Sequence, residues 1–100
     1  MAISPSFEHG GQKNIVQVSD GSVWHKWHDA DGWHNETLAG PAGGSALGCS
    51  AFTVNVSGDQ PGITLNADGS VDVTFEGTDS SGWIVSQASG ASSWTGGKLP

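Results

Sequence analysis

Tryptophans are the residues of this chain whose type and spacing most plainly suggest a binding chemistry. The 100 residues include five tryptophans but no tyrosine. A sugar ring packs its C–H bonds on an indole face, while its hydroxyls need a few fixed donors and acceptors. Trp24 and Trp27 lie three apart in an extended segment, so their side chains point to opposite faces. We expect Trp24 and Trp83 to pack between structural units, because both halves of the chain keep a tryptophan at that position. The ligand candidates are therefore Trp27, Trp33 and Trp94.

Polar side chains that could bond sugar hydroxyls lie beside these tryptophans. Each such hydrogen bond contributes on the order of 1 kcal/mol net, so a single site would bind in the micromolar to millimolar range. Repeated sites would raise the avidity without new contacts. The candidates are His28, His34, Asn35 and Glu36 in the first half of the chain, with Gln87 and Thr95 as rough counterparts in the second half.

Histidines and aspartates raise the question of a metal site. Zinc sites gather His or Cys ligands in tetrahedral sets. We expect His25 and His28 on opposite faces of one strand and His34 beyond a loop, so the three do not converge. Residues 29–32 resemble the start of a calcium loop, but the later ligands are missing and a turn is favoured. The sequence therefore predicts no metal and no cofactor.

No pattern in the chain is typical of a catalytic centre. The sequence contains no nucleophile elbow, no phosphate loop and no His-Glu-x-x-His motif. A glycosidase needs two facing carboxylates, and nothing in the sequence places Glu36 and Glu76, the best-fitting pair, together. We predict that the chain is not an enzyme.

The charge balance narrows the class of partner. The formal net charge is −7 at pH 7, with three lysines and no arginine. Nucleic acids and anionic membranes both require clustered cations, so a neutral partner such as a sugar is favoured. No run of about 18 apolar residues is present to span a membrane, and the first residues show no signal-peptide pattern. We expect a protein that acts outside the cell or at a cell surface. The single cysteine, Cys49, is expected to be a small buried residue.

Short strands dominate the expected secondary structure. The chain has 16 glycines and only 13 % charged residues, a composition that disfavours long helices. Residues 71–76 alternate apolar and polar side chains, which is typical of a half-buried strand. Turn-forming residues separate the strands expected in the second half, which span 63–66, 71–76, 83–87 and a short fourth strand that starts at 93–95 and ends near 98–100.

The first half repeats this plan. Its expected strands span 6–9, 14–18, 23–28 and 33–38. Trp24 would then correspond to Trp83, Trp33 to Trp94, and Leu38 to Leu99. Residues 41–60 are expected to form a linker that contains an extra strand at 51–56. This strand either extends a unit or replaces the weak first strand after chain exchange.

The expected fold is all-β, with one domain made of two antiparallel four-stranded units at residues 4–40 and 61–100. A single four-stranded sheet cannot bury its own face, so such units stack around an axis as the blades of a propeller. Two blades are too few to close a ring. We therefore expect a homo-oligomer, with three chains giving six blades as the first choice.

Several runs resemble a known family. Residues 20–27 and 32–33, and again 65–79, are similar in order to the blade repeat of bacterial β-propeller lectins of the Photorhabdus lectin type. That resemblance implies pockets between blades that bind fucose or a related sugar by aromatic stacking. The two-blade length resembles the small trimeric fucose lectins of plant-pathogenic bacteria. Their pocket uses an arginine that this chain lacks, and Ser86 stands where the first unit has Trp27.

Two other readings remain open at this stage. The chain could be a structural, fragmentary or designed propeller unit whose property is self-assembly. It could also be a β-sandwich adhesion module, which would be a monomer. The mass of the particle in solution separates the last reading from the first two.

Overall fold

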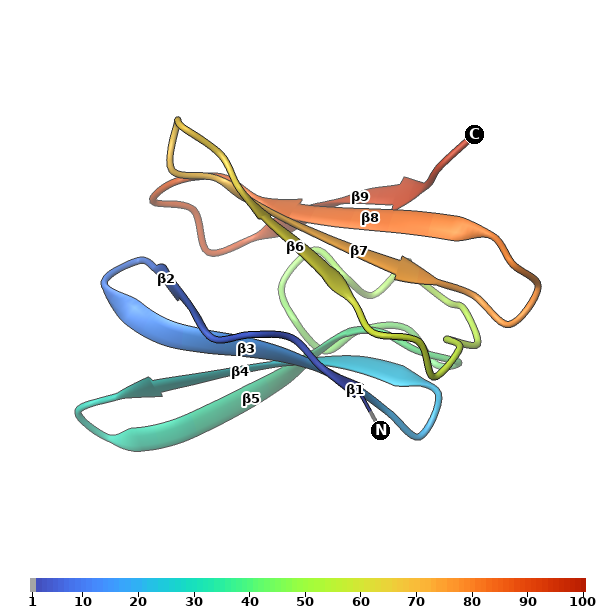
Figure 1. Cartoon of the computed structure of the whole chain (residues 1–100), viewed down its shortest axis with the longest axis horizontal. Helices are drawn as coiled ribbons and strands as arrows, with labels where there is room; N and C mark the ends of the chain where they lie inside the picture. Colours follow the sequence, from blue (N-terminus) through green and yellow to red (C-terminus); the bar gives the residue numbers. More distant parts are fainter. Residues whose placement is uncertain (1) are drawn as a thin grey trace.

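The computed structural model describes residues 2–100. All of its regular elements in that range are β-strands, and they form two antiparallel sheets. Figure 1 shows the sheets stacked as two layers, the first half of the chain in one and the second half in the other. The all-β prediction is confirmed, as are two similar four-stranded units.

The first sheet is built from five short segments that fill four strand positions. It contains β1 (Ala2–Ile3), β2 (Phe7–His9), β3 (Gln12–Ser19), β4 (Ser22–Asp29) and β5 (Gly32–Ala39). Both β1 and β2 pair with the same edge of β3, so the weak first strand is split in two. The remaining strands follow in chain order, because short turns join antiparallel neighbours.

The second sheet is a simple meander. Its strands are β6 (Gly62–Leu65), β7 (Val71–Glu76), β8 (Gly82–Gln87) and β9 (Trp94–Lys98), in that order across the sheet. The alternation predicted for 71–76 holds, with Val71 and Val73 fully buried and Phe75 nearly so. These side chains lie on the face turned toward the first sheet, which we call the inner face of each sheet.

One continuous core lies between the two inner faces. It joins Val16, Val18 and Val23 of the first sheet to Val73 and Val85 of the second. Each sheet therefore covers the apolar face of the other within one chain. A ring of copies was expected because a single sheet leaves its apolar face open. Packing of the two sheets within one chain already covers that face.

The segment between the sheets differs from the prediction, because residues 51–56 do not form a strand. Only isolated bridges occur there, from Thr53 to Gly40 and from Val56 to Gly77. Its alternating apolar residues act as anchors instead, since Phe52 and Val56 are buried in the core. The segment neither extends a sheet nor replaces a strand.

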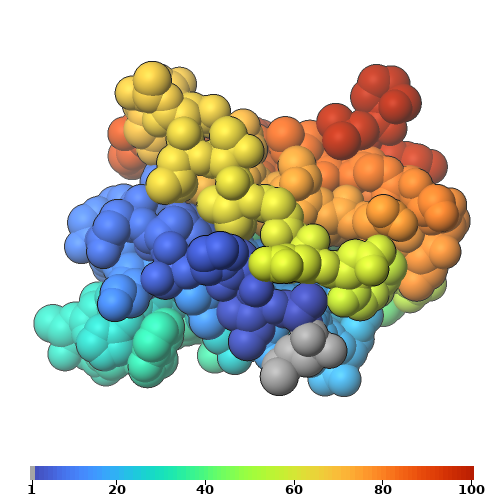
Figure 2. Space-filling model, in the orientation of Figure 1, coloured from blue at the N-terminus to red at the C-terminus, as the bar shows by residue number. Residues whose placement is uncertain are grey.

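This linker closes one end of the space between the sheets. The Val56 amide donates to the Gly21 carbonyl of the β3–β4 turn, and the Ser57 amide donates to the Glu76 carbonyl of β7. Figure 2 shows the yellow-green residues before β6 lying across the seam between the two halves. Position 48 requires a glycine. The φ angle of Gly48 is +89°, and a Cβ atom there would clash with the Trp94 carbonyl oxygen.

Trp24 and Trp83 lie on corresponding strands of the two sheets, but their side chains point to opposite faces. Trp24 points to the outer face of the first sheet and is half-buried, whereas Trp83 points inward and stacks on Phe75 with ring centroids 6.3 Å apart. A shift of one residue along a strand moves a side chain to the opposite face. Likewise Leu38 is fully buried, while its expected counterpart Leu99 is 42 % exposed.

Two smaller observations complete the fold. Cys49 is fully buried in the linker, as predicted, and burial together with the negative charge of Glu36 raises the pKa of its thiol to about 12. Such a thiol is unreactive at neutral pH. Residues 2–100 include no helix of the length and apolarity needed to cross a membrane.

Candidate functional site

A cavity of about 380 Å³ opens between the sheets, at the end opposite to the β3–β4 turn to which Val56 is bonded. The β2–β3 turn forms one rim and the β8–β9 loop forms the other. The two rims lie close together at the left of Figure 1. This volume is near the lower end of the range for small-molecule sites, roughly 300–1,000 Å³. The cavity is lined by His9, Gly10, Gln12, Asn14, His25, Trp27, Glu36, Gln87, Gly90, Ala91 and Ser92.

A chain of buried hydrogen bonds forms the wall that the first sheet contributes. Glu36 Oε2 lies 2.8 Å from His25 Nδ1, and His25 Nε2 lies 2.8 Å from Asn14 Oδ1. Asn14 and His25 are only 2 % and 6 % exposed. Antiparallel pairing places these residues side by side, because β4 pairs with both β3 and β5. Three polar groups are thus fixed on the inner face, next to the buried valines.

The orientation of Asn14 determines which atoms carry protons. Its Nδ2 group donates to the carbonyls of Phe7, His9 and Gln12, at 3.4, 3.2 and 2.9 Å, so its Oδ1 atom must face His25. Both ring nitrogens of His25 then face acceptors. Nε2 of His25 then donates to Asn14 Oδ1, and the hydrogen bond between Nδ1 and the Glu36 carboxyl group contains one shared proton. The pair adds no net charge to the cavity wall.

Aromatic contacts hold Trp27 beside this network. Its ring lies 5.0 Å from His25 and 5.2 Å from His34, nearly parallel to both. The Trp94 indole meets His25 edge-on at 5.4 Å, and its Nε1 group donates to Glu36 Oε2 at 3.4 Å. The indole of Trp27 is therefore fixed in place, and its uncovered part borders the cavity.

The second sheet supplies the opposite wall through one amide. Gln87 Oε1 lies 3.0 Å from His9 Nε2 and so joins β8 to β2 across the rim. Gln87 and His9 are both half-buried. The cavity thus combines a carboxylate, amides, imidazoles and an indole, a set suited to a small ligand rich in hydroxyl groups.

The structure separates the residues predicted from the sequence. Trp27, Glu36 and Gln87 meet at the cavity, with His34 stacked behind Trp27. His28, Trp33 and Asn35 point to the outer face of the first sheet, and Thr95 is exposed on the second sheet, opposite Ser86.

Trp94 requires a correction. We expected it to face a ligand, but it is 2 % exposed and belongs to the core between the sheets. It starts β9 with its side chain turned inward, where it caps the Glu36 carboxylate. Its indole has no face open to a ligand in this chain.

Four of the cavity residues with an imidazole or amide side chain were not proposed as binding residues from the sequence. These are His9, Gln12, Asn14 and His25. A usable signal exists for two of them, because Asn14 lies at an inward position of β3 beside Val16 and Val18, and His25 at an inward position of β4 between Val23 and Trp27. A polar residue at such a position needs a buried partner. The rim positions of His9 and Gln12 carry no such signal.

An acidic cluster lies at the β4–β5 turn, outside the cavity. Ligand atoms of Asp29, Asp31 and His34 lie within 4.8 Å of one another. Local bonds explain this arrangement, since Asp29 Oδ1 accepts from the Asp31 amide at 2.8 Å and contacts His34 Nε2 at 2.9 Å. These hydrogen bonds, that of His34 first, lower the pKa of Asp29.

Comparison with known proteins adds no relative. No protein-family model, no curated protein and no solved structure matches this chain.

Proposed function

We propose that this protein binds carbohydrate and that the cavity between the sheets holds a monosaccharide. One observation carries the proposal: strands of both sheets bring Trp27, Glu36 and Gln87 to a single cavity of monosaccharide scale. All three were ligand candidates before the fold was known. The resemblance to fucose-binding lectins makes fucose the first sugar to test.

The chemistry of the wall supports a neutral ligand. Because Glu36 and His25 share the proton of their hydrogen bond, the pair carries no net charge and favours neither an anion nor a cation. Glu36 Oε2 is held by His25 and Trp94, which leaves its other carboxylate oxygen to accept a sugar hydroxyl. Because buried bonds fix these groups before a ligand arrives, little side-chain entropy is lost on binding.

Titration with a panel of monosaccharides, followed by tryptophan fluorescence and calorimetry, tests the proposal. We expect fucose or a related sugar to perturb Trp27. Gln87→Ala should weaken binding about five- to tenfold, because one hydrogen bond of roughly 1 kcal/mol and part of the rim are lost. Gln60→Ala is the matched control, since Gln60 is exposed and lies outside the cavity. Equal binding by both variants, or no sugar signal in the wild type, would refute a sugar site here.

Self-assembly of three chains into a six-bladed ring is a separate prediction from the sequence. Such a ring would bring the outer face of the first sheet of one copy against the second sheet of the next. Light scattering during size exclusion tests it, because a ring would have three times the chain mass of 10.2 kDa. A monomer would favour the β-sandwich module. The packing of the two inner faces within one chain also supports that reading.

A further inference from the structure

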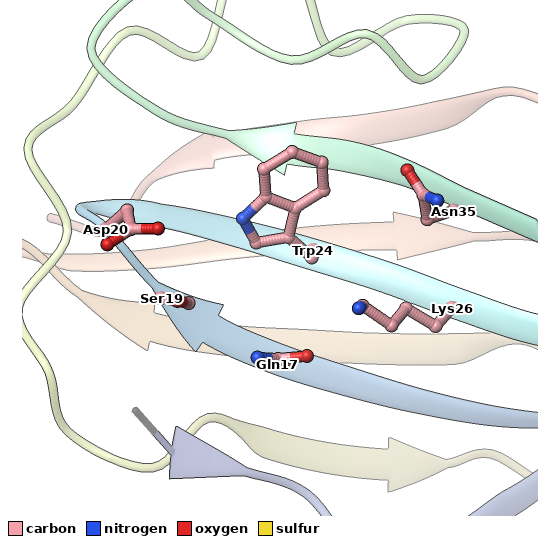
Figure 3. Close-up of a pocket in the computed structure, with 6 residues that line it drawn as sticks. All are labelled: Gln17, Ser19, Asp20, Trp24, Lys26 and Asn35. Atoms are coloured by element: carbon pink, nitrogen blue, oxygen red, sulfur yellow. The ribbon is translucent and has the colours of Figure 1, made fainter.

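The outer face of the first sheet carries two adjoining hollows. One is bordered by Trp24 and the other by Trp33, and both are lined by Gln17, Lys26 and Asn35. Figure 3 shows the first hollow, with the Trp24 indole on β4, Lys26 further along the same strand, Asn35 on β5 and Gln17 on β3. Shared lining residues make the two hollows one groove with an indole toward each end.

The pairing of the strands fixes how far apart the backbone positions of Trp24 and Trp33 lie along the sheet. Trp24 pairs with Thr37 and His28 pairs with Trp33, so Trp33 and Thr37 mark the two positions on β5. Four residues of strand separate them, which is about 13 Å at the usual rise. That backbone span exceeds one pyranose ring, so the groove is long enough for more than one sugar unit.

The centre of the groove is polar. Lys26 and Asn35 are directly opposite each other on β4 and β5. Lys26 forms no ion pair among residues 2–100, and Asn35 is exposed. An ammonium and an amide between two indoles suit a chain of sugars, which presents C–H faces for stacking and hydroxyls between them. A protein surface docked here would instead have to bury the Lys26 ammonium.

The tryptophans of this face are not required by the core. Trp33 is 60 % exposed, and its ring meets that of His28 in a T-shaped contact with ring centroids 5.2 Å apart. The apolar core lies on the other side of the sheet. The outer face therefore offers an open indole at Trp33 to a ligand, next to the hollow that Trp24 borders.

We propose that this groove is a second carbohydrate site, distinct from the cavity, which binds a neutral oligosaccharide across Trp24 and Trp33. It stands on the outer face alone and does not depend on the cavity binding a monosaccharide. Each chain would then carry two sites on opposite faces of one sheet, one for a single sugar and one for several linked sugars.

An array of neutral oligosaccharides tests the proposal, followed by calorimetry with the strongest binder and with its own monosaccharide unit. We expect the oligosaccharide to bind and the monosaccharide not to compete for the groove. Trp24→Ala and Trp33→Ala should each weaken oligosaccharide binding at least about tenfold. Leu47→Ala, which truncates another highly exposed apolar side chain, should not.

Three controls keep this test separate from that of the cavity. Gln87→Ala should leave oligosaccharide binding unchanged, while Trp33→Ala should leave monosaccharide binding unchanged. Because Trp33 is exposed, its variant carries the test even if Trp24→Ala fails to fold. Unchanged oligosaccharide binding by Trp33→Ala, or an array with no signal, would overturn the proposal. So would a wild-type oligomer that Trp33→Ala converts to a monomer, since this face would then bind a second copy.

Discussion

The two sheets share one strand plan but place their polar and apolar residues in opposite ways. The inner face of the second sheet is apolar, with Val71, Val73 and Val85 fully buried. The inner face of the first sheet interrupts its valines with Asn14, His25 and Glu36. The second sheet therefore serves mainly as a packing platform, and the first sheet carries most of the groups able to contact a ligand.

The outer faces differ as well. The first sheet exposes Trp33 beside Asn35, whereas the second presents hydroxyls and carboxylates such as Thr74 and Asp72. Asp72 is bonded on both oxygens, by Ser86 Oγ at 2.5 Å and Asn66 Nδ2 at 3.0 Å. Repetition of a strand plan thus fixes the architecture of this chain without repeating its chemistry.

The largest expected effect comes from a charge on the apolar inner face. Val73→Asp should abolish folding, because Val73 is 0 % exposed and the new carboxylate would lie within the apolar core. Thr74→Asp is the matched control, since the neighbouring side chain points to the outer face. Circular dichroism and thermal melting compare them, and a cooperative melt of Val73→Asp near the wild-type temperature would refute the register of β7.

A smaller effect is expected where the inner face is polar. His25→Leu should lower the free energy of unfolding by about 2–4 kcal/mol, because Glu36 Oε2 and Asn14 Oδ1 lose their partner. Urea unfolding measures the loss. Replacing Asn14, His25 and Glu36 together by leucine should recover part of it, since the carboxyl group that His25 leaves behind is then removed, although Trp94 Nε1 loses its acceptor. No loss in the single variant would show that the network is not a structural element.

The smallest effect concerns the bonded carboxylate on the second sheet. Hydrogen bonds from Ser86 first and Asn66 second lower the pKa of Asp72. A carboxyl group with a lowered pKa in the folded state stabilises the protein above its unfolded pKa of about 3.9, and this contribution is lost as the pH falls through the folded value. Asp72→Asn should therefore cost about 1 kcal/mol or less at pH 7, because the group is partly solvated.

Thermal melts of the wild type and Asp72→Asn between pH 7 and pH 2 measure this contribution. The two curves should converge as the pH falls below about 4. If the difference in melting temperature between the two proteins stays constant over the whole pH range, the ionised form of Asp72 does not contribute to stability.

Strands could be predicted from the sequence where one face of the strand is buried and the other is exposed to solvent. Residues 71–76 show this alternation, and the structure forms β7 there. Residues 51–56 show the same alternation without being a strand, because Phe52 and Val56 are anchored in the core one at a time. Alternation reports burial, and burial does not require a paired neighbour on each side.

Part of the cavity was also accessible from the sequence. Trp27, Glu36 and Gln87 were singled out by residue type, but their convergence depends on two sheets packing face to face. Trp94 illustrates the limit, since its residue type suggested a ligand contact and its position in β9 turned it into the core. Propensity cannot distinguish these outcomes, because a single step in register reverses the side chain.

The sequence by itself determined the strands, their order and the all-β class, because local turn chemistry and period-two burial act within a few residues. Only the tertiary structure decided which faces meet, where the linker seals the interface and which polar groups surround a cavity. Those outcomes depend on contacts between residues far apart in the chain, such as Trp94 with Glu36, and no local pattern encodes them.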